Sequence, residues 1–127
     1  METERLLHRR EDLVHATTRL KEALNEEPTE LAIDGVLHRF EFTFELAWKV
    51  MKDKLEFMGV IEKTGSPREV IKSAFQYNII DDGEAWIEMM LSRNMLSHMY
   101  DEKQSRDIYS KIKNTYINLL LKLVDAI

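Results

Sequence analysis

Apolar residues follow a helical period along most of the chain. Between about Thr3 and Leu24, Leu6, Leu13 and Leu20 recur at heptad spacing. From about Glu30 to Met58 the recurrence is every three or four residues without a missed turn, at Ile33, Leu37, Phe40, Phe44, Ala47, Met51, Leu55 and Met58. The pattern predicts two long amphipathic helices, and a rise of ~1.5 Å per residue makes the second roughly 40 Å long.

Capping signals predict three further helices. Ser66-Pro67-Arg68-Glu69 is a capping box with proline at the first helical position, so a short helix should run from Pro67 to Tyr77. Asp81, followed by Glu84, should cap a fourth helix, and apolar spacing predicts a last one over Ser105–Ala126. We therefore expect one all-α domain over residues 1–127, an antiparallel up-and-down bundle of four main helices plus one short helix.

Composition agrees with helices and narrows the chemistry. The 127 residues include only four Gly and two Pro, and they are 44% hydrophobic and 32% charged. The chain has no cysteine, which excludes disulfides, thiolate zinc sites and thiol nucleophiles and fits a reducing cytoplasm. Neither a signal peptide nor an apolar run of the ~18 residues that a membrane span needs is present, so a soluble cytoplasmic protein is expected.

The net charge of −5 argues against broad electrostatic attraction to nucleic acid. Any RNA contact would need a local basic surface. Six cations are candidates for one, namely Lys49, Lys52, Lys54, Arg93, Lys111 and Lys113.

The densest group of chemistry-bearing side chains lies between Ser92 and Glu102. On an ideal helix Arg93, Ser97 and Tyr100 share one stripe, and Asn94, His98 and Asp101 share the adjoining stripe. The planar guanidinium of arginine binds phosphate through several N–H donors in a fixed geometry, and histidine can accept and donate protons near neutral pH. The pattern predicts a phosphodiester site with Arg93 and His98 as catalytic residues, supported by Asn94 and Ser97.

Structural explanations compete at each of these positions. Arg93 could instead form a surface ion pair with Asp101 or Glu102, and His98 could sit at a helix C-terminus because of the helix dipole. Glu41 and Glu45 could form a paired-carboxylate active site, but a solvated or salt-bridged face explains them better, with Glu45 and Lys49 at favourable i,i+4 spacing.

No metal site or cofactor is expected. His8 and His15 lie seven residues apart on one helix face, but no third ligand at suitable spacing completes a metal site.

Four blocks of the sequence resemble a known family. Arg93-Asn94, followed after three residues by His98-Met99-Tyr100, resembles the R-x4-H-x-Y motif of HEPN domains. The other blocks are Arg39-Phe40-Glu41-Phe42-Thr43-Phe44-Glu45-Leu46-Ala47-Trp48-Lys49, Ser66–Ile71 and Ile80–Trp86, which resemble the nucleotidyltransferase substrate-binding branch. The resemblance runs from about the second helix to the end of the chain.

The resemblance implies a partner and an activity. HEPN proteins of this type pair with a minimal nucleotidyltransferase as the toxin of a toxin–antitoxin system, and they act as metal-independent ribonucleases. The 2′-hydroxyl of RNA is an internal nucleophile, so a proton acceptor and a cation on the phosphate suffice without a metal. One chain offers a single histidine here, and a homodimer with the motif near its interface would supply a second. The resemblance also implies that the partner silences the toxin by adenylylating Tyr100.

Two other functions stay open. The chain could be a non-catalytic, substrate-binding subunit of a two-chain nucleotidyltransferase; it lacks the Gly-Ser and Asp-x-Asp pattern of the catalytic subunit, so it should not transfer nucleotides alone. It could also be a purely structural bundle.

Overall fold

The structure is a computed structural model that describes residues 2–60, 65–98 and 100–127. Its helices are α1 (Glu2–Leu24), α2 (Glu30–Phe57), α3 (Pro67–Gln76), α4 (Gly83–Met95) and a C-terminal run made of α5 (Glu102–Lys111), the π-helical turn η1 (Ile112–Tyr116) and α6 (Ile117–Ala126). No strand occurs within these ranges. The prediction of an all-α fold with four main helices and one short helix is confirmed, and no helix in the described part is long and apolar enough to cross a membrane.

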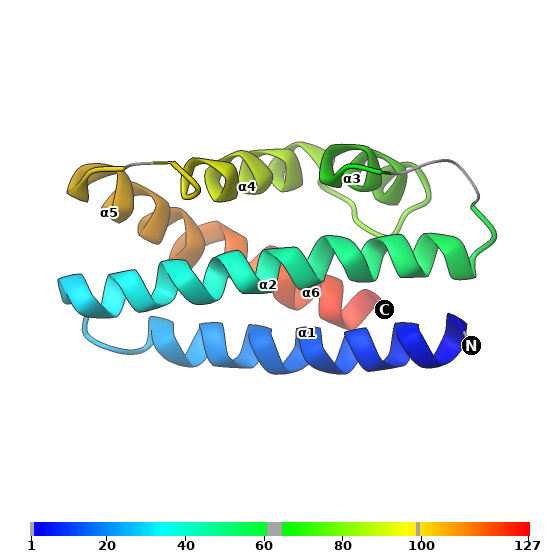
Figure 1. The fold of residues 1–127 in the computed structure, drawn as a ribbon, viewed down its shortest axis with the longest axis horizontal. Helices are drawn as coiled ribbons and strands as arrows, with labels where there is room; N and C mark the ends of the chain where they lie inside the picture. Colours follow the sequence, from blue (N-terminus) through cyan, green and yellow to red (C-terminus); the bar gives the residue numbers. More distant parts are fainter. Residues whose placement is uncertain (1, 61–64, 99) are drawn as a thin grey trace.

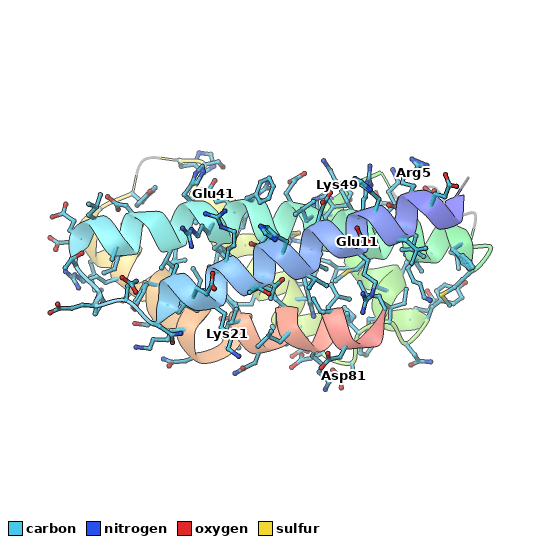
Figure 2. The ribbon with its side chains drawn as sticks, turned by 90° about the horizontal axis from the view of Figure 1, so that it is seen from below. Arg5, Glu11, Lys21, Glu41, Lys49 and Asp81 are labelled. Carbon is cyan, nitrogen blue, oxygen red and sulfur yellow. The ribbon has the colours of Figure 1, made fainter. Side chains whose placement is uncertain are left out.

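The helices form a bundle centred on α2. Figure 1 shows α1 antiparallel to α2 on one side, α3 and α4 in succession along the other side, and the C-terminal run crossing behind α2. In Figure 2, Glu41 and Lys49 of α2 point away from α6, whereas Asp81 lies at the α6 side. One face of α2 is therefore left open between α1 and α4, opposite the C-terminal run.

The predicted stripe of α2 becomes the core. The stripe residues from Ile33 to Leu55 are at most 3% exposed, whereas Met58, just beyond the helix, is 47% exposed. Phe40 stacks on Tyr116 of η1 with ring centroids 5.6 Å apart, and Phe44 packs against Trp86 of α4 at 6.4 Å. The aromatic side chains of α2 therefore anchor both α4 and the C-terminal run.

Local capping chemistry sets the helix ends, and it corrects two predicted starts. The Ser66 cap of α3 is confirmed, because its hydroxyl accepts the Glu69 N–H at 3.3 Å. The cap of α4 is Asp82 rather than Asp81, which pairs instead with Lys122 of α6. The last helix begins at Glu102 rather than Ser105, because Asp101 and Gln104 form a reciprocal capping box.

Candidate functional site

Arg93 reaches from the last turn of α4 to α2. Its Nη2 donates to Oε1 of Glu45 at 2.5 Å, and its Cζ lies 5.8 Å from the centre of the Phe44 ring. The side chains of Arg93 and Glu45 are 28% and 32% exposed, so about two thirds of each is shielded from water. The guanidinium is thus held between a carboxylate and an aromatic face, with part of its donor fork still open to solvent.

The alternative explanation of Arg93, an ion pair with Asp101 or Glu102, is wrong. Asp101 caps α5, and Glu102 pairs with Arg106 at 3.4 Å. Glu45 is the partner instead, at a sequence separation of 48 residues that no helical spacing could reveal. The predicted pair of Glu45 with Lys49 is confirmed at 3.7 Å, so Glu45 binds both cations.

The helix ends before the motif does. Helix α4 stops at Met95, and the N–H groups of Ser97 and His98 donate to the carbonyls of Asn94 and Met95 at 3.1 and 3.2 Å. The single ideal helix assumed for residues 93–101 is therefore wrong, and the two predicted side-chain stripes are not formed. Met99, between His98 and Tyr100, lies outside the described residues.

The turn leaves His98 accessible. Its imidazole is exposed, just past the end of α4, and forms no hydrogen bond or ion pair with any other residue in the described ranges. Asn94 is also exposed, whereas the Ser97 hydroxyl is used locally and donates to the Asn94 carbonyl at 2.6 Å. The imidazole of His98 is therefore accessible to a substrate, and Ser97 stabilises the turn that carries it.

Tyr100 lies at a different level of the bundle from Arg93. It is half-buried in a cavity of about 200 Å³ between the first turn of α2 and the start of α5, together with Glu30, Ile33, Asp34, Asp101, Glu102, Ser105 and Arg106. Ile33 precedes Glu45 by 12 residues on α2, which corresponds to roughly 18 Å along the helix axis. Tyr100 therefore does not share a stripe with Arg93, and its surroundings are rich in carboxylates.

A buried hydrogen bond joins α4 to the C-terminal run. The Ser92 and Tyr116 hydroxyl oxygens are 2.7 Å apart, and both residues are buried. Burial raises the pKa of Tyr116; the nearby Glu88 carboxylate raises it too, while the Ser92 hydrogen bond opposes them. A neutral Tyr116 thus ties the C-terminal run to the residue next to Arg93.

Three of the six candidate cations for a basic surface are paired with carboxylates. Arg93 and Lys49 both pair with Glu45, and Lys111 pairs with Glu88 at 3.7 Å. Within the described ranges no group of three or more His, Asp and Glu side chains could hold a metal ion.

The family profile described as "Nucleotidyltransferase substrate binding protein like" matches residues 8–127. The chain belongs to this family. A curated Haemophilus influenzae protein named "Probable ribonuclease HepT" is 28% identical over 88 residues, which are 67% of this chain. The chain spans about 60% of that relative's length in the match.

Two solved structures share the fold of this family member. One, from Thermus thermophilus, has a TM-score of 0.76 at 28% sequence identity, and the match covers 89% of this chain and 96% of the Thermus chain. The other, from Haemophilus influenzae and described as the fold of a substrate-binding domain of a nucleotidyltransferase, has a TM-score of 0.79 at 21% identity, with coverages of 91% and 96%.

Proposed function

We propose that this chain is the partner subunit of a minimal nucleotidyltransferase and acts as a metal-independent endoribonuclease, the toxin of a toxin–antitoxin pair. The supporting observation is the arrangement at the end of α4: Arg93 is braced by Glu45 and Phe44, and the next turn presents an accessible His98. The relative named as a ribonuclease supports the same reaction class.

The proposed reaction uses the 2′-hydroxyl of the RNA. His98 takes its proton as the O2′–P bond forms, while Arg93 stabilises the negative charge on the phosphorane oxygens. The P–O5′ bond then breaks, and O5′ receives a proton from a protonated imidazole. The products are a 2′,3′-cyclic phosphate and a 5′-hydroxyl, so no water, metal or oxidant is consumed.

A homodimer would supply the second imidazole. Leu91 and Met95 are 50% and 44% exposed and lie four residues apart on α4, on either side of Arg93 in the sequence. Two such apolar faces can bury each other around a two-fold axis. This contact would bring together the ends of α4 from two copies, each followed by the turn that carries His98, while Arg93 faces α2 on the opposite side of the helix.

Adenylylation of Tyr100 by the partner would silence the site. Because Tyr100 is remote from the Arg93 guanidinium, the attached nucleotide would act on the turn that carries His98, two residues away. Its bulk and its phosphodiester charge would compete there with an RNA phosphate.

The second candidate is a non-catalytic, substrate-binding subunit of the nucleotidyltransferase. The Glu45 carboxylate favours this second function, because it already binds part of the Arg93 guanidinium that would otherwise bind phosphate. In this version Arg93 and His98 bind substrate or partner without chemistry.

The deciding experiment is cleavage of RNA by the partner-free protein in excess chelator, with intact mass showing Tyr100 unmodified. Wild type should cut, His98→Ala should not, and His8→Ala, which removes an exposed histidine of α1, should cut normally. Equal cutting by wild type and His98→Ala would refute the role of His98. No cutting by any protein would favour the binding subunit.

A further inference from the structure

We propose that a cationic and aromatic groove between α1 and α2 binds one nucleotide of single-stranded RNA beside the cleaved bond. This inference rests on the proposed ribonuclease function and names a substrate contact outside the R-x4-H-x-Y motif. The groove has a volume of about 450 Å³ and is lined by Asp12, His15, Ala16, Arg19, His38, Arg39, Phe42 and Thr43.

Small residues open the groove. Ala16 of α1 and Thr43 of α2 lie at its floor, and both are buried. The Thr43 hydroxyl lies 2.7 Å from the Arg39 carbonyl and 3.5 Å from the Ala16 carbonyl, so it hydrogen-bonds locally and across to α1. Both side chains are small, so the longer side chains around them form the walls of the groove.

The walls carry cations without carboxylate partners. Arg39 Nη1 donates to the Arg19 carbonyl at 2.8 Å, which holds this guanidinium across the two helices. In the described part of the chain no carboxylate forms an ion pair with Arg19 or Arg39, unlike Arg93 and Arg106. Two arginines against the one carboxylate of Asp12 make this groove a local attraction for phosphate in a chain of net charge −5, and the two histidines add ring nitrogens for hydrogen bonds.

An aromatic ring completes the recognition chemistry. Phe42 lines the groove and is 61% exposed, so its ring is accessible from solvent beside the arginines. An exposed ring beside arginines offers a stacking platform for a base whose phosphate binds the cations. Stacking of this kind tolerates any base, so the groove should select single-stranded RNA without a strict sequence requirement.

The groove lies close enough to the motif to hold the same strand. Phe42 precedes Glu45 by three residues on α2, a rise of about 4.5 Å, and Glu45 binds Arg93. Figure 2 shows that Glu41, the sequence neighbour of Phe42, and Lys49, one turn after Glu45, both point away from α6. A strand bound at Arg93 can cross this side of α2 and place a neighbouring nucleotide in the groove.

Binding of a labelled, uncleavable 2′-O-methyl RNA, followed by fluorescence anisotropy, tests the proposal. Phe42→Ala should weaken binding by about 5- to 150-fold, the range that base stacking on an aromatic side chain contributes. Arg19→Gln should lower the slope of log affinity against log salt by about 0.7, the loss of one phosphate contact. Matched controls are Phe75→Ala, whose ring is 51% exposed on α3, and Arg106→Gln on α5; neither should change binding.

Each failure has a separate meaning. If wild type cuts RNA and Phe42→Ala binds it equally well, the groove proposal is overturned while the ribonuclease stands. If Phe42→Ala turns a dimer into a monomer, the surface is an interface between copies and the groove proposal is again overturned. If wild type neither binds nor cuts RNA, both proposals fail.

Discussion

Glu45→Gln is the substitution that best separates binding from chemistry at the site. Glu45 accepts from Arg93 at 2.5 Å and lies 3.7 Å from Lys49, with about a third of its side chain exposed. The amide keeps the shape and one acceptor oxygen but removes the negative charge. The exchange should therefore loosen the hold on Arg93 while making the guanidinium more available to phosphate.

Two magnitudes follow from this geometry. A phosphate on Arg93 would sit roughly 5 Å from the Glu45 carboxylate, and at the dielectric constant of water that repulsion is about 0.8 kcal/mol. Its removal should tighten binding of an uncleavable RNA about 4-fold at low salt. Loss of a charge-assisted hydrogen bond that is partly shielded should cost about 1 to 2 kcal/mol of stability, which lowers Tm by roughly 4 to 8 °C in a chain of this size.

The cleavage rate should move the other way. A less constrained Arg93 stabilises the phosphorane less well, so kcat should fall by about 10-fold while KM decreases. Single-turnover cleavage and anisotropy on the same preparation measure the two effects. Asp125→Asn is the matched control, because Asp125 is exposed near the end of α6, away from the open face of α2, forms no ion pair in the described part of the chain and should leave both quantities unchanged. Weaker RNA binding by Glu45→Gln would refute the reasoning.

Three further outcomes are expected. Burial raises the pKa of Tyr116, so the folded protein holds this proton more tightly than the unfolded chain, and the free energy of unfolding should fall as the pH rises above about 10. In urea unfolding from pH 7 to 11, Tyr116→Phe should be about 1 kcal/mol less stable than wild type at pH 7, because Ser92 loses its partner, and its stability should fall less steeply with pH. Light scattering should show a dimer that Leu91→Glu with Met95→Glu converts to a folded monomer, and a monomeric wild type would contradict the proposed interface. Co-expression with the partner nucleotidyltransferase should add the mass of AMP to wild type but not to Tyr100→Phe, and an unchanged wild-type mass would rule out that mode of silencing.

Sequence periodicity was sufficient for the fold because the signals are local. The apolar stripe of α2 from Ile33 to Leu55 is buried as predicted, and Ser66 caps α3 as its capping box indicates. The period of an amphipathic stripe and a capping box are both set within one or two helical turns, so spacing identified the stripe of α2 and the start of α3, but it misplaced the cap of α4 by one residue and the start of the last helix by three.

The fine structure of the motif was not predictable in the same way. Extending one helical period across residues 93–101 placed Ser97 and Tyr100 on the stripe of Arg93, but α4 ends at Met95 and a separate capping box starts α5. Asp101 and Gln104 carry a local capping signal that starts a new helix here, and the C-terminal run that follows packs through Tyr116 on Phe40 and Ser92.

The sequence by itself determined which residue types are present for chemistry, the helices that carry them and the family. Only the tertiary structure decided their partners: it joined Arg93 to Glu45, separated Tyr100 from that pair, and set two arginines and Phe42 around one groove. The physical reason is that an ion pair or a groove between helices depends on the angle and register at which they pack. Those are set by side chains distant in sequence, such as Ala16 and Thr43, whose small size lets α1 and α2 come together there.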